Sequence, residues 1–202
     1  MSFFSTITEM PWLVSTEPAA ENPLASSSPK KVALVVFLGV VSSLFFLFVA
    51  AYLIRMSYGD WQPLKDSQIL WLNTLILVAS SIAFQLARNA TTREQRRSTL
   101  QYLLLAGFLT LTFLSAQLWV WQQISSDGAA VLVNPASSFF YLLTGAHGLH
   151  LIGGLYVWLR TVVRTLFGYN AVSVKLSVEL CSVYWHYLLL VWLVLLGLLF
   201  ST

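Results

Sequence analysis

Two histidines, His147 and His150, lie three residues apart in the apolar segment FFYLLTGAHGLHLIGG, which runs from residue 139 to 154. Side chains at positions i and i+3 share one face of a helix. A polar side chain in lipid is costly, and it usually faces other protein segments or serves a function. The pair could bind a metal or haem, carry protons, or hold helices together inside a larger membrane complex.

A third histidine, His186, lies in the last apolar segment, within VELCSVYWHYLLLVW. A haem ligated from both sides would take one histidine from each of two helices, and three imidazoles could ligate a metal ion. A metal-bound histidine is usually oriented by a second group such as a carboxylate, and the sequence places none at this depth. We therefore expect no metal and no cofactor in this chain. Buried histidines hydrogen-bonded to neighbouring helices are the favoured interpretation.

Glycines accompany the histidine pair. Gly145, Gly148 and Gly153 recur along the same segment. Because a glycine has no Cβ, a neighbouring helix can approach closely at such positions. We expect this close approach to shorten interhelical hydrogen bonds from His147 and His150.

Few other polar side chains enter the apolar segments. Glu179 is the only one of eight carboxylates that touches a segment, and it lies seven residues before His186, on the same helix face. We expect the N-terminal end of its own helix and Lys175 to stabilise it. Gln117 is a single amide that we expect to bond another helix. Proton transporters usually carry several ionisable groups through the midplane, so proton conduction by this chain is not expected.

These residues must be positioned by membrane helices. Hydrophobic residues make up 57% of the 202 residues and charged residues 9%, against about 25% charged in soluble domains. Each apolar segment has about the 20 residues needed to cross a bilayer, and only helices satisfy their own backbone in lipid. The fold class is an all-α integral membrane protein, a bundle of five transmembrane helices. Its predicted spans are 32–54, 68–87, 100–124, 136–163 and 179–200, after an extended cytoplasmic tail over 1–31.

Basic residues predict the orientation of the bundle. If the spans alternate in direction, nine of the eleven basic residues fall on one side. They are Lys30, Lys31, Arg88, Arg93, Arg96, Arg97, Arg160, Arg164 and Lys175. Only Arg55 and Lys65 fall on the other side. The positive-inside rule then places the N-terminus in the cytoplasm and the C-terminus outside.

Four segments resemble subunit III of the haem-copper terminal oxidases, and together they cover nearly all of the chain from Val32 onward. The two most specific are TGAHGLHLIGG and VELCSVYWHYLLLVW, in this order, with Glu179 seven residues before His186. FLGVVSSLFFLFVAAYLIR and LWLNTLILVASS are similar to the first two spans of the family, and Gln117 occupies the glutamine position of its QxxEW stretch. The five-span length is similar to the shorter bacterial version.

The resemblance implies an accessory subunit that binds no redox cofactor, because haem and copper belong to partner subunits. Its partners would be subunit I, subunit II, a small subunit IV and membrane lipids, in the bacterial inner membrane, with no nucleic acid. The resemblance also implies lipid in a cleft between the first two spans and the other three, with head groups near Arg88, Arg96 or Arg160. A cytochrome c oxidase is favoured over a quinol oxidase. The alternatives are an accessory subunit of a nitric oxide reductase and a stand-alone haem-binding membrane protein.

Three positions depart from the family pattern. The family often has acids where this chain has Val41, Val120 and Leu189. All three residues are aliphatic, so they cannot bind a proton. We therefore expect structural and lipid-binding roles for this chain and no collection of protons by it.

Overall fold

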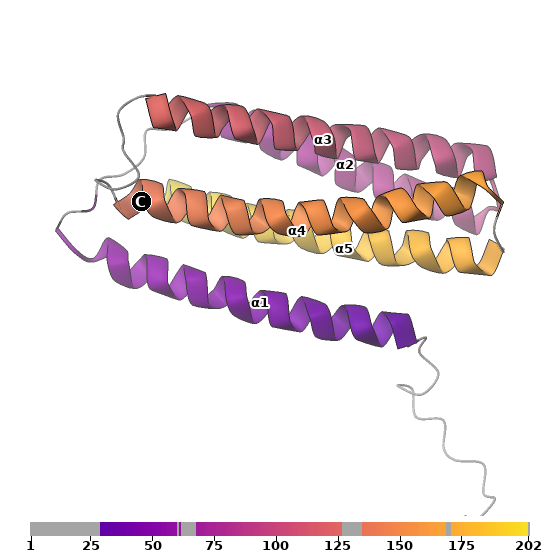
Figure 1. Cartoon of the computed structure of the whole chain (residues 1–202), viewed down its shortest axis with the longest axis horizontal. Coiled ribbons are helices and arrows are strands. Elements are labelled where there is room, and N and C mark those ends of the chain that lie inside the picture. The colour runs from indigo at the N-terminus through magenta and orange to yellow at the C-terminus, as the bar shows by residue number, and fades with distance from the viewer. Residues whose placement is uncertain (1–28, 60, 62–67, 127–134, 169–170, 202) are drawn as a thin grey trace, which may run out of the picture.

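Five long helices form the described part of the chain, which in this computed structural model comprises residues 29–59, 61, 68–126, 135–168 and 171–201 (Figure 1). The helices are α1 (Pro29–Met56), α2 (Gln68–Thr92), α3 (Arg96–Ser126), α4 (Pro135–Leu166) and α5 (Ala171–Phe200). Each is long and apolar enough to cross a membrane. The predicted all-α fold with five spans is confirmed. Most of the predicted tail, residues 1–28, lies outside the described residues.

The helices extend beyond the predicted spans at the ends. The helix α1 begins at Pro29, a residue suited to a first helical turn because its missing N–H would have no intrahelical partner. The helix α5 begins at Ala171, whereas the predicted span began at Glu179. The prediction began the span at the carboxylate Glu179, so the first two turns of α5, which carry Lys175, were missed. Glu179 therefore lies inside a helix and not at its start.

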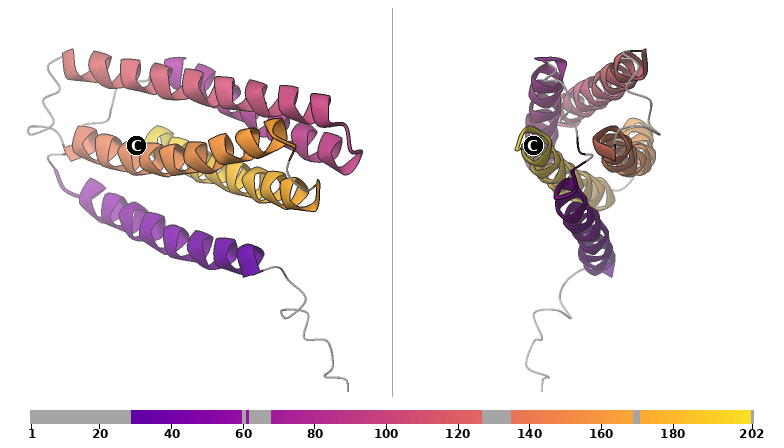
Figure 2. Two further views of the ribbon diagram at one scale, coloured as in Figure 1. Left: turned by 45° about the vertical axis from the view of Figure 1, so that its right-hand side comes forward. Right: turned by 90° about the vertical axis from the view of Figure 1, so that its left-hand side faces the viewer.

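Helices α2 to α5 form a four-helix bundle. The helix α2 packs on α3 and α5, while α4 packs on α3 and α5, and every neighbouring pair is antiparallel (Figures 1 and 2). Apolar side chains from all four helices fill the centre at 0–1% exposure. They include Leu77, Phe84, Leu103, Phe113, Leu151 and Leu188. This core gives the bundle a fixed packing that positions its polar residues.

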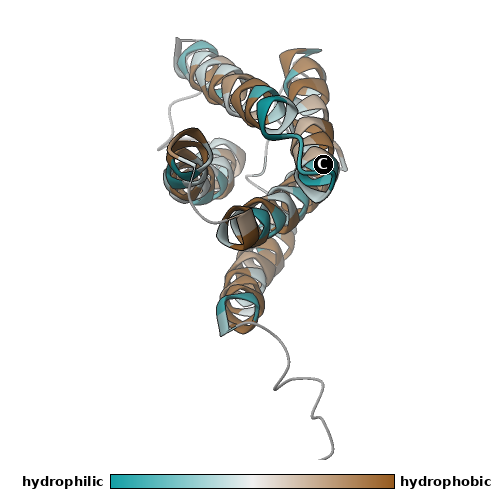
Figure 3. Cartoon of the chain, turned by 90° about the vertical axis from the view of Figure 1, so that its right-hand side faces the viewer, coloured by the Kyte–Doolittle hydropathy of each residue, from teal (hydrophilic) through white to brown (hydrophobic). Residues whose placement is uncertain are grey.

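The helix α1 lies beside this bundle and contacts only α4 and α5 among the described helices (Figure 2). Three of its residues, Val41, Phe45 and Tyr52, are buried. The expected division of two spans from the other three is therefore wrong, because α2 belongs to the bundle and α1 stands apart alone. Apolar residues also cover the outer faces of the helices (Figure 3), as expected for a protein surrounded by lipid.

A tight turn joins α2 to α3. Glu94 has a positive φ of 57°, and the backbone N–H groups of Gln95 and Glu94 donate to the carbonyls of Ala90 and Thr91 at 3.0 and 3.1 Å. This pattern is a Schellman motif, in which the left-handed position is usually occupied by glycine. The turn is short, and it makes α2 and α3 antiparallel neighbours.

We predict that Glu94→Gly stabilises the protein. A left-handed conformation costs an L-residue about 1–2 kcal/mol, and the extra chain entropy that glycine loses on folding offsets roughly half of that gain. The expected rise in stability is therefore about 0.5–1 kcal/mol, measured by thermal unfolding in detergent. Gln95→Gly, one residue further along the same turn, is the control and should bring no gain. Equal effects of the two changes would contradict the argument.

Candidate helix-contact and lipid sites

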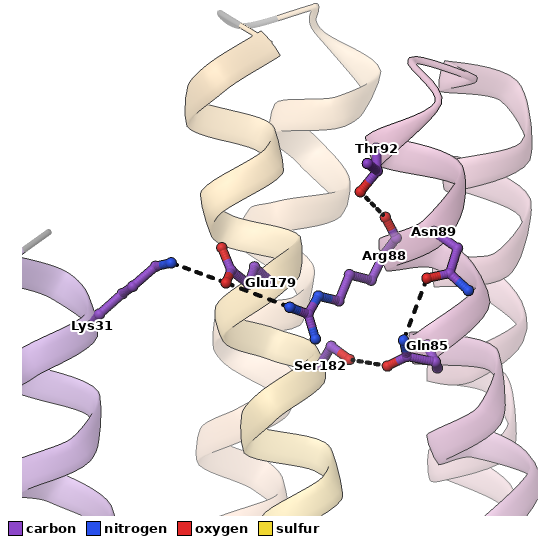
Figure 4. A network of polar contacts seen from close by, with 7 residues as sticks. All are labelled: Lys31, Gln85, Arg88, Asn89, Thr92, Glu179 and Ser182. Carbon is purple, nitrogen blue, oxygen red and sulfur yellow. Dashed lines mark hydrogen bonds and ion pairs between the residues drawn. The ribbon is translucent and has the colours of Figure 1, made fainter. Parts of the chain in front are cut away.

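Glu179 links three helices near the basic end of the bundle, defined as the end that carries Lys31, Arg88, Arg96, Arg160 and Lys175. Its Oε1 accepts a hydrogen bond from Lys31 Nζ of α1 at 3.0 Å and lies 3.6 Å from Arg88 Nη2 of α2 (Figure 4). Two cations therefore share one carboxylate, and the cluster carries a net positive charge. The expectation that Lys175 and the end of α5 stabilise Glu179 is wrong, because its partners come from α1 and α2.

Two amides extend this cluster along the boundary between α2 and α5. Ser182 Oγ donates to Gln85 Oε1, and Gln85 Nε2 donates to Asn89 Oδ1, both at 3.4 Å (Figure 4). The side chain of Glu179 keeps 28% of its surface exposed. Partly exposed ion pairs contribute only about 0–1 kcal/mol each. The cluster therefore specifies which helices meet at the basic end more than it stabilises them.

His147 lies in the centre of the bundle at 1% exposure. Its ring lies 5.4 Å from the Trp192 ring of α5 and 6.3 Å from the Phe113 ring of α3, measured between centroids. Neither ring nitrogen has a hydrogen-bond partner among the described residues. His147 therefore contacts rings of two other helices. The predicted interhelical hydrogen bond from its side chain is not formed among the described residues, because aromatic rings surround the imidazole.

His150 lies at the contact between α4 and α1. Its Nδ1 bonds the carbonyl of Ala146, on its own helix, at 2.7 Å. Its ring packs against Phe45 and Phe37 of α1, at centroid distances of 5.5 and 6.4 Å. The ring of His150 thus joins two helices by packing, and the predicted interhelical hydrogen bond from this side chain is wrong.

His186 lies on the outer surface of α5, in an exposed position. Its Nδ1 bonds the carbonyl of Ser182 on the same helix at 2.6 Å. The three histidines therefore occupy three different surroundings, namely the bundle core, the α1 contact and the outer surface. No group of three metal-ligating side chains forms within the described residues. A haem held between His186 and either of the others does not fit these positions.

Gln117 of α3 forms a hydrogen bond with an amide of α2. Its Oε1 accepts from Asn73 Nδ2 of α2 at 3.1 Å, and both side chains are buried. Asn73 is a partner that sequence reasoning missed, although it lies in the quoted segment LWLNTLILVASS. The presence of a second amide on an adjacent predicted span could have revealed this pair, because a buried amide needs a polar partner.

Tryptophan side chains carry several of the remaining polar contacts between helices. Trp192 Nε1 donates to Thr74 at 2.9 Å, and Trp185 Nε1 donates to Thr110 at 3.1 Å. Trp121 Nε1 donates to Thr144 at 3.1 Å, which joins α3 to α4. Sequence reasoning missed these pairs, because hydropathy does not show which side chains of two helices face each other. A tryptophan opposite a threonine of a neighbouring span is the signal that could have found them.

Of the three predicted glycines, Gly145 lies against another helix, since a Cβ built there would meet the Trp121 indole of α3 at 3.4 Å. A Cβ built on Gly148 or Gly153 would meet nothing within 4 Å. A Cβ on Gly154 would lie 2.7 Å from Tyr184 and 3.0 Å from Trp185 of α5. A Cβ on Gly107 would overlap the Trp158 indole. Gly154 and Gly107 are therefore the positions where a missing Cβ makes room for an aromatic ring.

The three arginines expected to bind head groups differ in their surroundings. Arg88 pairs with Glu179. Arg96 donates from Nε to the Thr165 carbonyl at 2.8 Å and also contacts the Leu166 carbonyl, so it caps the end of α4. Arg160 is exposed on α4. Arg160 is thus the arginine of the three whose guanidinium is open to a lipid phosphate.

Two hollows lie between the described helices. A groove of about 230 Å³ lies between α1 and α5 and is lined almost entirely by apolar residues, including Phe46, Val49, Leu190 and Val194. Ser42 Oγ and the Tyr187 hydroxyl meet across it at 3.0 Å. At the basic end a hollow of about 430 Å³ is lined by Thr91, Glu94, Arg96, Thr99, Thr165 and Gly168, among others. The apolar groove has the chemistry of an acyl-chain site, and the basic-end hollow that of a polar one.

Known proteins with similar sequences indicate the family of this chain. The sequence profile of the family described as cytochrome c oxidase subunit III matches residues 30–201. The probable cytochrome c oxidase subunit 3 of Mycobacterium tuberculosis is 29% identical over 140 residues, covering 68% of this chain and 69% of the relative. The cytochrome c oxidase subunit 3 of Thermostichus vulcanus is 28% identical over 173 residues (83% and 84%). That of Papio hamadryas is 31% identical over 136 residues (66% and 50%).

The fold and its contacts define a multi-pass α-helical membrane protein whose polar side chains mostly join its own helices. The chain belongs to the cytochrome c oxidase subunit III family, since the profile covers all five helices. It is therefore part of a multi-subunit oxidoreductase complex. The resemblance identified from the two histidine motifs is confirmed.

We predict that Gly154→Ala destabilises the bundle and that Gly153→Ala does not. The added Cβ at residue 154 would press on Tyr184, whose hydroxyl donates to the His150 carbonyl at 2.9 Å, and on the buried Trp185. Overpacking of this kind costs about 1–3 kcal/mol. Thermal unfolding in detergent measures both variants. A larger loss for the residue 153 variant would contradict the observed packing.

Proposed function

We propose that this chain is the noncatalytic subunit III of a respiratory haem-copper oxidase of the cytochrome c oxidase type, in a bacterial inner membrane. The match of the family profile over residues 30–201 carries this proposal. The chain would pack on subunit I, with subunit II and a small subunit IV in the same complex. Haem and copper would belong to the partner subunits, and this chain would support assembly and sustained electron transport.

The surroundings of the family's acid positions support a role without proton conduction. Val41 and Val120 are buried at 4% and 1% exposure, and Leu189 packs on the core. A charge at any of these depths would cost at least about 2.5–3.5 kcal/mol. Within the described helices, Glu179 is a carboxylate that already has two cationic partners. The chain then offers no series of proton-binding groups across the bilayer.

Phospholipid is the second partner that we propose. An acyl chain would occupy the groove between α1 and α5, whose lining is apolar. Head groups would lie at the basic end, near Arg160 and Arg88, with Arg96 beside the polar hollow. Each basic residue near an anionic membrane surface contributes about 1 kcal/mol to such attraction. The net positive charge around Glu179 favours a phosphate there.

Co-purification tests the proposed function. A tagged full-length chain should retain haem-copper subunits I and II, identified by mass spectrometry, and the complex should show a Soret band from the partner. The isolated chain should show none. A Soret band of the isolated chain that is lost on changing His147 or His186 would instead indicate a haem protein. Retention of a nitric oxide reductase would place the chain in another complex.

We predict that Glu179→Gln weakens assembly and lipid retention more than it changes turnover of the intact complex. The glutamine keeps the shape of the side chain but loses the charge that attracts Lys31 and Arg88. Yield of the assembled complex, bound phospholipid per complex and oxygen consumption are the three measurements. Glu94→Gln, in the exposed turn at the same end, is the matched control for assembly and oxygen consumption, but not for lipid retention, because Glu94 lines the polar hollow. Intact assembly with loss of proton pumping would contradict the proposal.

A further inference from the structure

One layer of the four-helix bundle collects three buried polar side chains. Asn73 Nδ2 donates to Gln117 Oε1 at 3.1 Å, which sets α2 and α3 level with each other. Trp192 Nε1 donates to Thr74, the residue after Asn73, so α5 joins the same level. His147 of α4 lies 5.4 Å from the Trp192 ring. Trp192 therefore contacts His147 and also bonds the turn of α2 that carries the Asn73–Gln117 pair.

This layer is incompletely hydrogen-bonded. Four buried atoms have no hydrogen-bond partner among the described residues: Asn73 Oδ1, Gln117 Nε2 and the two ring nitrogens of His147. Each such atom costs about 1–3 kcal/mol if it stays unpaired. Buried polar atoms are nearly always paired, either with protein or with ordered water. These four atoms therefore require hydrogen-bond partners that the described residues do not supply.

The unpaired atoms complement one molecule in particular. A neutral imidazole offers one donor and one acceptor, an amide oxygen accepts, and an amide nitrogen donates. A water molecule can donate to Asn73 Oδ1 and to the accepting ring nitrogen while it receives a hydrogen bond from Gln117 Nε2. No charged side chain is among these groups, so the layer does not suit an ion.

Apolar side chains close the layer on both sides. Phe140, Leu143 and Leu195 lie towards the end opposite the basic end, and Leu77, Leu151 and Leu188 lie towards the basic end, all at 0–1% exposure. Water in the layer would be separated from the surface along the bundle axis. Such a site hydrates a buried polar group, and it does not form part of a proton path.

We propose that His147, Gln117 and Asn73 form an internal water site in the centre of the bundle. The bound water bridges the imidazole of α4 to the amide pair of α2 and α3. It supplies hydrogen bonds that aromatic neighbours cannot give, and so it fixes the ring of His147 between Phe113 and Trp192. The site goes beyond the proposed function and does not depend on it.

A high-resolution cryo-electron microscopy map of the intact complex tests the site directly. We expect density for an ordered water about 2.7–3.2 Å from a His147 ring nitrogen and from at least one of the two amides. A map in which His147 bonds Gln117 or Asn73 directly, with no water between them, would overturn the proposal. So would a map in which neither amide shares a water with His147.

Substitutions give a second, independent measurement. His147→Phe and Gln117→Leu should each lower the melting temperature of the full-length chain in detergent, because each leaves the remaining polar atoms with fewer partners. The triple variant His147→Phe, Gln117→Leu, Asn73→Leu removes the polar groups together, so its loss should be smaller than the sum of the single losses. His150→Phe is the control and should add independently to Gln117→Leu. Fully additive losses among the three layer residues would overturn the proposal.

Discussion

Hydrocarbon offers no hydrogen-bond partner, and this constraint governs where each polar side chain of the bundle lies. Helices satisfy their own backbone N–H groups, so a hydrogen bond between helices needs a side chain, which pairs with another side chain or with a carbonyl that accepts a second bond. Indole N–H groups meet the constraint repeatedly: Trp192 bonds Thr74, Trp185 bonds Thr110, and Trp158 bonds the Leu103 carbonyl. An indole brings a large apolar surface together with a single donor. It can therefore fill the core and fix a neighbouring helix at the same time.

The helices were predictable because hydropathy depends on composition over about 20 residues, whereas pairing depends on which face each residue occupies. Five spans followed from the sequence, with ends that differed mainly at α5. The partners of Glu179 did not follow. Lys31 lies 148 residues away and was counted as part of the tail, while Lys175 was nearer in sequence. Proximity along the chain is a weak guide in a bundle where helices far apart in the sequence, such as α1 and α5, pack against each other.

The histidines show the same limit of predicting contact partners from position in the sequence. Their presence in apolar segments indicated contacts between helices, and two of them do contact other helices. Their surroundings could not be read from spacing, since i and i+3 lie on adjoining but distinct parts of a helix face. His147 faces the core and His150 faces α1. Helix orientation is set by the whole apolar face, so one turn decides whether a ring meets Trp192 or Phe45.

The helix α1 depends on few contacts, and they are spread over its length. Lys31 pairs with Glu179 near the basic end, Ser42 meets Tyr187 midway, and Tyr52 packs on Phe139 near the other end at a centroid distance of 5.6 Å. Val41 lies between Phe37 and Phe45, whose rings cover His150. An aliphatic residue there needs no partner in lipid. The contact of α1 with the bundle is thus mostly apolar, with one hydrogen bond midway and an ion pair at the basic end. The outer face of α1 is left to lipid or to another subunit.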